Sequence, residues 1–153
     1  MRRIALFLLL LASACGDSVK EEELRRNLGN EQSGTDQADP GTAAVRIGEF
    51  GPNFRACALV GTARQAGPEG GDPLEVRAAP YDNAAGTGSI PADARFFICT
   101  RSLDQRWLGI VYHEAGTLDP GCGVSRAVPS RRDYAGPCRS GWVSAAFVKQ
   151  IAG

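Results

Sequence analysis

The side chains best suited to nucleophilic or metal chemistry in this 153-residue chain are one histidine and five cysteines. His113 stands beside Glu114, directly after an apolar run, and an imidazole there could act as a general base. The simpler interpretation is a surface residue at the end of a strand. The carboxylates show no spacing that singles out an acid–base pair, and the sequence contains no Gly-x-Ser-x-Gly, His-Glu-x-x-His or phosphate-loop pattern. We therefore expect a protein that is not an enzyme and that holds no cofactor and no metal.

The first fifteen residues have the layout of a secretory signal. Arg2 and Arg3 are basic, residues 4–12 are apolar, and small residues precede Cys15. The apolar stretch is too short to span a bilayer as a permanent helix. One interpretation is an ordinary signal peptide cleaved after Ala14. We favour a lipoprotein signal, because Cys15 has no other cysteine within forty residues and an unpaired exported thiol would be reactive.

Residues 11–15, Leu-Ala-Ser-Ala-Cys, resemble the bacterial lipobox. The resemblance implies that residues 1–14 are removed and that Cys15 becomes an acylated N-terminus, which partners the chain with a membrane. Gly16 differs from the Asp that marks inner-membrane retention in the enterobacterial lipoproteins that this segment resembles. We therefore expect export and lipid anchoring, with the protein on the periplasmic face of the outer membrane.

The other four cysteines form an even set in a chain expected to be exported. That compartment favours disulfides, and four cysteines allow three pairings. We prefer the pairing of Cys57 with Cys99 and of Cys122 with Cys138. A zinc site with four cysteine ligands is the rival interpretation, but no close Cys-x-x-Cys pair is present to begin one.

Composition divides the chain after the leader into a tether and a domain. Residues 16–43 hold seven acidic and three basic side chains, are polar and show little periodicity, so we predict a mostly disordered tether over 15–43. Residues 44–153 hold twelve basic and ten acidic side chains. The formal net charge of the whole chain is +0, which argues against a nucleic-acid partner.

Short apolar runs separated by glycine and proline predict an all-β domain over 44–153. The chain has 19 Gly and 9 Pro, and no long helical pattern interrupts the runs. The strongest strand signals are 94–100 and 106–112, which are rich in aromatic and β-branched residues. We expect five to six short strands that form a small barrel.

Three segments, taken in order, resemble the bacterial SH3-like (SH3b) domain family. They are Leu-Glu-Val-Arg-Ala-Ala-Pro at 74–80 with Gly-Ser-Ile-Pro at 88–91, the hairpin around Arg-Trp-Leu-Gly-Ile-Val at 106–111, and Gly-Trp-Val-Ser-Ala-Ala-Phe-Val-Lys at 141–149. The resemblance implies an SH3-like barrel with an aromatic-lined cleft. Where that family has a tight turn, this chain has an insertion of about 113–140, which a Cys122–Cys138 disulfide would close.

Six residues are candidates for ligand binding. The aromatic candidates are Tyr81 in a turn, Trp107 and Tyr112 on the strongest strand, and Tyr134 in the insertion, which also carries Arg131 and Arg132. Guanidinium groups beside an aromatic ring could bind an anionic partner.

The resemblance implies a non-enzymatic cell-envelope lipoprotein whose SH3b-like domain binds peptidoglycan or a periplasmic protein. The alternative is an inhibitor of a wall-degrading enzyme such as lysozyme, because small disulfide-bonded β-barrel lipoproteins also include such inhibitors. In that case the insertion would plug the active site of the enzyme.

Overall fold

A computed structural model describes residues 41–64 and 72–151 of the chain. The expected leader 1–14, Cys15 and the tether up to residue 40 lie outside the described residues. The chain divides into two compact units, 1–37 and 38–153, and the second holds every strand described below. Among the described residues, no helix is long and apolar enough to cross a membrane.

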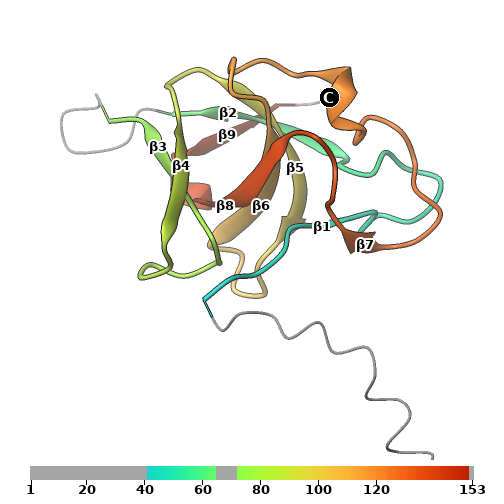
Figure 1. The fold of residues 1–153 in the computed structure, drawn as a ribbon, viewed down its shortest axis with the longest axis horizontal. Coiled ribbons are helices and arrows are strands. Elements are labelled where there is room, and N and C mark those ends of the chain that lie inside the picture. Colours follow the sequence, from blue (N-terminus) through green and yellow to red (C-terminus); the bar gives the residue numbers. More distant parts are fainter. Residues whose placement is uncertain (1–40, 65–71, 152–153) are drawn as a thin grey trace, which may run out of the picture. The chain divides into compact units, whose positions relative to one another are not determined.

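Residues 41–64 and 72–151 form an all-β structure, as the sequence predicts (Figure 1). Seven strands make the main sheet in the order β4-β3-β8-β6-β5-β2-β9, with neighbours antiparallel. The hydrogen-bonded ladder begins at β4, ends at β9 and does not close on itself. Its strands are β2 (Leu59–Ala63), β3 (Leu74–Arg77), β4 (Gly86–Ile90), β5 (Arg95–Arg101), β6 (Trp107–Tyr112), β8 (Arg139–Ser144) and β9 (Val148–Ile151).

A second, two-stranded sheet pairs β1 (Arg46–Ile47) with β7 (Arg132–Asp133). Single 3-10 turns form η1 (Pro120–Cys122) and η2 (Ala145–Phe147). The described residues thus hold nine strands, where the sequence predicts five to six. The additional strands are short, and β1 and β7 contain only two residues each, which is too few to give a periodic pattern.

The main sheet is buried on both faces at its centre. Along β5, Phe96 and Ile98 pack in one cluster while Phe97 and Cys99 pack in another, because alternate side chains of a strand point to opposite faces. We call the first cluster the strand core, since strands of the main sheet and their turns supply it. Its buried members are Ala63, Leu74, Val76, Ile90, Ala94, Phe96, Ile98, Leu108, Ile110, Tyr112, Val143 and Val148.

The second cluster, which we call the covered core, lies where two loops cover the opposite face. The N-terminal segment 43–57 and the insertion 113–140 supply roughly half of its side chains. Backbone hydrogen bonds join these two loops, from Ala56 N to Arg126 O (2.8 Å) and from Tyr134 N to Val45 O (2.8 Å). The buried members are Val45, Ile47, Ala56, Cys57, Val60, Phe97, Cys99, Trp107, Val111, Cys122, Val124, Val128 and Trp142.

One glycine of β6 allows the N-terminal segment to pack closely against the sheet. A Cβ on Gly109 would clash with Thr100 Cγ2 and would lie 3.3 Å from Val45 Cγ1. Gly109 pairs with Thr100 beside the bulge at Cys99, where the register of β5 and β6 shifts. Close packing of Val45 therefore depends on the missing side chain at position 109.

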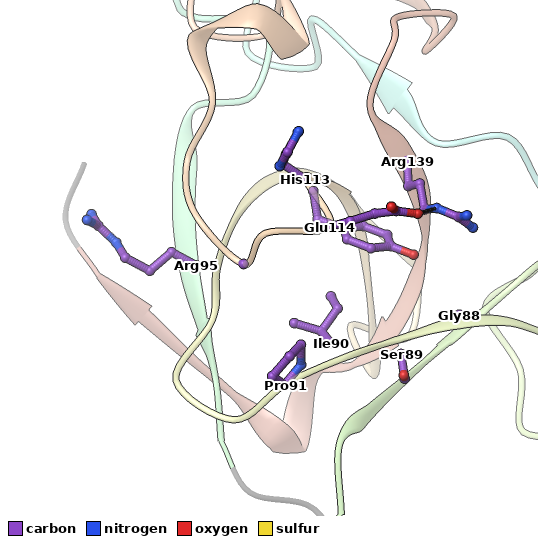
Figure 2. Close-up of a pocket in the computed structure, with 10 residues that line it drawn as sticks. Gly88, Ser89, Ile90, Pro91, Arg95, His113, Glu114 and Arg139 are labelled. Atoms are coloured by element: carbon purple, nitrogen blue, oxygen red, sulfur yellow. Dashed lines mark hydrogen bonds and ion pairs between the residues drawn. The ribbon is translucent and has the colours of Figure 1, made fainter.

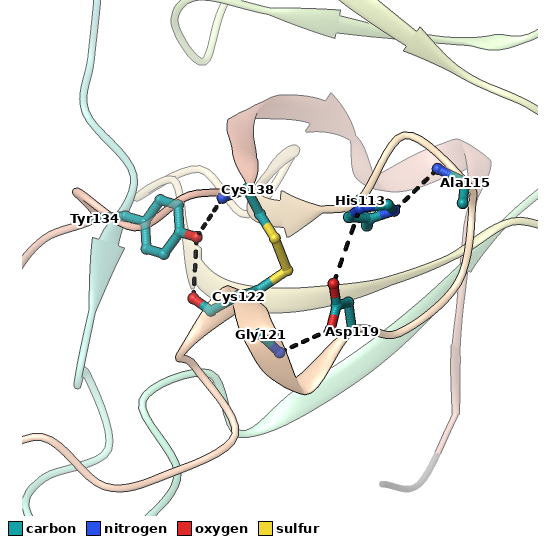
Figure 3. Close-up of a disulfide and its surroundings, with 7 residues drawn as sticks. All are labelled: His113, Ala115, Asp119, Gly121, Cys122, Tyr134 and Cys138. Atoms are coloured by element: carbon teal, nitrogen blue, oxygen red, sulfur yellow. Dashed lines mark hydrogen bonds and ion pairs between the residues drawn. A yellow bond between two sulfur atoms is a disulfide. The ribbon is translucent and has the colours of Figure 1, made fainter.

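The structure contains two disulfides, and both join the cysteines paired in the preferred scheme. Cys57–Cys99 connects the N-terminal segment to β5 inside the covered core, with both residues buried. Cys122–Cys138 closes the insertion, with Cys122 buried and Cys138 partly exposed (Figure 3). The insertion packs onto the sheet through Val124 and Val128. It is therefore part of the fold.

Candidate ligand-binding site

The six residues predicted to bind a ligand do not form one groove. Trp107 and Tyr112 lie at the two ends of β6, each only 5% exposed. Trp107 packs in the covered core and Tyr112 in the strand core, so their rings are on opposite faces of the sheet. Five positions separate the two residues, and an odd spacing on a strand puts side chains on opposite faces. The expectation that both rings line one exposed cleft is therefore wrong.

Tyr134 has a structural position inside the insertion (Figure 3). Its hydroxyl donates to Cys122 O at 3.0 Å and accepts from Cys138 N at 3.1 Å, so it bridges the two sides of the disulfide. Burial raises the pKa of the Tyr134 phenol. The donor and one acceptor position of this hydroxyl are therefore used inside the fold.

The remaining three candidates, Tyr81 and the adjacent Arg131 and Arg132, are exposed. Tyr81 is in the turn between β3 and β4, and Arg132 is in β7. Arg131 forms an ion pair with Glu49, at 3.5 Å from Nη1 to Oε2. Exposure alone does not make any of these three residues a binding site.

A pocket of about 330 Å³ lies beside Trp107, at the start of β6. We call it the Phe147 pocket, after the aromatic side chain that η2 places at its edge. The amide of Ala145 donates to Arg106 O at 2.8 Å and so ties η2 to the start of β6, beside Trp107. The pocket is lined by Asp72, Pro73, Leu74, Glu75, Arg77, Asp82, Trp107, Ser144 and Phe147.

The Phe147 pocket combines aromatic rings with an excess of acidic groups. Three carboxylates and one guanidinium line it. Arg77 donates to Glu75 Oε2 at 2.7 Å and to Ala84 O at 2.9 Å, which fixes the turn that carries Asp82. The carboxylate of Asp82 forms an ion pair with Arg106, at 3.4 Å from Nη2 to Oδ2. Phe147 is 38% exposed, so its ring is available to a ligand. Phe147 belongs to the closing motif 141–149 but is not among the six residues expected from the sequence to bind a ligand.

A second pocket, of about 300 Å³, lies at the far end of β6 (Figure 2). We call it the Tyr112 pocket. Its lining includes Ser89, Arg95, His113 and Glu114 as well as Tyr112. Burial raises the pKa of the Tyr112 phenol. Figure 2 shows the Arg95 side chain extending away from the other labelled residues, so the polar groups do not converge on one point.

His113 makes local contacts with residues of the loop that follows β6. Its Nδ1 accepts from the amide of Ala115 at 3.2 Å, and its Nε2 lies 3.8 Å from Asp119 Oδ2 (Figure 3). Asp119 also accepts from Gly121 N at 2.7 Å and caps η1. The neighbouring sulfurs belong to Cys122 and Cys138, so no free thiol stands beside the imidazole.

One group of side chains is close enough together to be considered as a metal site. Its ligand atoms lie within 4.8 Å of one another and belong to Asp119, Cys122 and Cys138. The two sulfurs are bonded to each other in the disulfide, whereas a cysteine binds a metal ion through its free thiolate. The donor set in this oxidised form does not fit a metal ion.

Comparison with protein-family models, with curated proteins and with solved structures finds no match for this chain. The interpretation of the site therefore depends on its geometry and on the sequence resemblance.

Proposed function

We propose that residues 38–153 form a non-enzymatic binding module of a cell-envelope lipoprotein, and that its ligand occupies the Phe147 pocket. The single observation that carries this proposal is the meeting of η2 with the start of β6 and the turn before β4. That arrangement combines the partly exposed ring of Phe147 with Trp107 and the carboxylate of Asp82. A concave site that joins aromatic surface to a few polar groups is typical of ligand recognition.

We also propose that the domain is SH3-like. In support, the first motif lies on the β3–β4 hairpin and the second on β6, and the third begins on β8, which pairs with both β3 and β6. The third motif then continues through η2 into β9, which pairs with β2 at the other edge of the sheet. The open ladder is the principal difference from the expected closed barrel.

The chemistry of the Phe147 pocket suits a peptide that carries a free amine. An ammonium group gains from both an aromatic face and nearby carboxylates. The stem peptides of peptidoglycan offer amine and carboxylate groups on a repeating polymer, which makes peptidoglycan the first ligand to test. In this proposal, acylated Cys15 anchors the module to the periplasmic face of the outer membrane, and the tether 15–43 gives the domain access to the wall.

The inhibitor alternative has less support from the geometry. A plug needs side chains that project from the insertion, but the Tyr134 hydroxyl is bonded inside it and Val124 and Val128 are core residues. Of the arginines, Arg139 pairs with Glu114 and Arg131 with Glu49. The insertion thus has the contacts of a structural element.

Sedimentation of residues 38–153 with purified peptidoglycan sacculi tests the proposal. We expect co-sedimentation, and we expect Phe147→Ser to weaken it by about tenfold or more, the effect of losing a central aromatic contact. Phe54→Ser is the matched control, because Phe54 is 58% exposed and does not line the pocket. A domain that stays in the supernatant would exclude peptidoglycan as the ligand, and equal binding by the Phe147→Ser variant would remove the pocket from the proposal.

A further inference from the structure

Two hollows on the surface lie next to each other and are not explained by the Phe147 pocket. Their volumes are about 240 and 640 Å³, and they share Glu49, Thr100 and Arg101 as lining residues. Phe50 lines the smaller hollow and Leu103 the larger one. We call this surface the arginine face, and define it by Arg46, Phe50, Arg101, Leu103 and Arg131.

Leu103 is held in an ordered turn and is fully exposed. The turn joins β5 to β6, and Ser102 organises it: its carbonyl accepts from Gln105 N at 3.0 Å and its hydroxyl accepts from Trp107 N at 3.0 Å. The carboxylate of Asp104 accepts from Ser102 Oγ and from Arg106 N, contacts that hold the pKa of Asp104 below its ordinary value. The turn therefore holds a large apolar side chain in water beside the basic groups of the arginine face, where it is free to contact a partner.

The three guanidinium groups around Leu103 are only partly neutralised. Arg46 and Arg131 share one carboxylate, that of Glu49, at 3.7 and 3.5 Å. Arg101 donates to the neutral amide oxygen of Gln150 at 2.6 Å. The one other acid lining either hollow is Asp104, whose carboxylate is engaged by Ser102 and Arg106. Positive charge is thus in excess on the arginine face.

We propose that the arginine face binds an anionic lipid surface, with Leu103 and Phe50 entering the interface and the arginines at the headgroup phosphates. Apolar side chains beside cationic ones are the pattern by which proteins bind to the surface of a membrane. A soluble phosphate would gain nothing from Leu103. A folded protein partner would need a cavity shaped for the protruding turn, whereas a lipid interface deforms around it.

This surface is separate from the proposed function, since it shares no lining residue with the Phe147 pocket. Lipid binding by the arginine face does not depend on acylation of Cys15, because the face consists of residues of the domain itself. If the chain is anchored as we propose, the arginine face would hold the domain against the bilayer that carries the anchor.

The experiment is co-sedimentation of residues 38–153, which carry no acyl group, with vesicles. One set is pure phosphatidylcholine and the other contains about one third phosphatidylglycerol. We expect binding only to the second set, weakened by moderate salt because surface charges are screened. Arg101→Gln should weaken binding about fivefold, the effect of one basic residue near an anionic surface. Leu103→Ser should weaken it by a similar factor or more.

Two variants serve as controls. Arg95→Gln removes the same charge from the other end of β5, about 20 Å away along the strand. Phe147→Ser alters the Phe147 pocket and should leave lipid binding unchanged, so failure of this inference and failure of the proposed function can be told apart. Circular dichroism confirms that each variant is folded.

Four outcomes would overturn the inference. The first is that the domain does not bind the anionic vesicles, and the second is that Arg95→Gln weakens binding as much as Arg101→Gln does. The third is that the Arg101→Gln and Leu103→Ser variants both bind as well as the unchanged domain. The fourth is that inorganic phosphate competes with the vesicles more strongly than chloride does at equal ionic strength. The last result would assign the arginines to a soluble anion.

Discussion

Tyr81 and Tyr134 show how the same residue type takes different roles in this domain. Both were predicted to contact a ligand, and both lie outside regular strands. The Tyr134 hydroxyl bridges Cys122 O and Cys138 N, whereas Tyr81 presents an exposed ring in a turn. The difference comes from the disulfide, which brings two backbone polar groups to within reach of one phenol.

This contrast predicts a measurable difference in stability. Tyr134→Phe should lower the free energy of unfolding by about 1–3 kcal/mol, because partly buried backbone groups lose their partner. Tyr81→Phe is the matched control and should change it by less than about 0.5 kcal/mol. Urea denaturation with disulfides intact measures both values. Equal stability of the two variants would show that the Tyr134 hydroxyl contributes nothing to the fold.

At the scale of elements, the insertion 113–140 covers one face of the sheet. Cys122, Val124 and Val128 supply buried side chains, and β7 pairs with β1 in the N-terminal segment. Two loops far apart in sequence therefore close one core together, and each stabilises the other.

The two disulfides should differ in what their removal does. Replacing Cys122 and Cys138 by serine should lower the free energy of unfolding by about 3 kcal/mol, while the main sheet stays folded. This is the loop-closure value for a disulfide between two cysteines that are 16 residues apart in sequence. Replacing Cys57 and Cys99 by alanine should cost more, since this bridge lies inside the covered core and also leaves a space there. Thermal unfolding followed by far-ultraviolet circular dichroism compares the two. A larger loss from the Cys122–Cys138 pair would contradict this order.

At the scale of the whole molecule, the domain begins earlier than the first strand of the main sheet. Ala43 N donates to Ala78 O at 2.9 Å, and Ala43 O accepts from Trp142 Nε1 at 2.7 Å. Trp142, which belongs to the closing motif, is thereby joined to the start of the domain. A boundary at residue 44, as expected from composition, would remove both hydrogen bonds.

Truncation tests this boundary. A chain of residues 38–153 should unfold in one cooperative transition. A chain that starts at residue 58 should bind the dye ANS and aggregate, because loss of Val45 and Ile47 exposes Phe97, Val111 and Trp142. Size-exclusion chromatography and dye fluorescence distinguish the two products. A monomeric, cooperative chain from residue 58 would show that the N-terminal segment is dispensable.

Some of this structure follows from the sequence because the responsible signals are local. Alternation and β-branched residues identify β3, β5 and β6, and glycine and proline place the turns. An even set of four cysteines, two of them within the insertion, led to the pairing that the structure contains. Trp107 and Tyr112 are five positions apart on one strand, and this odd spacing by itself predicts that their side chains face opposite ways.

The tertiary structure decided which faces are covered and which side chains remain exposed. Nothing local marks Val45, Val124 and Val128 as cover for the far face of β5, because their segments have no strand or helix period of their own. Phe147 and Leu103 likewise became candidate contacts only when η2 and the β5–β6 turn were placed beside Trp107 and Arg101. Periodicity reports the burial of a segment against its immediate neighbours, whereas pockets and covered faces arise from contacts between segments distant in sequence.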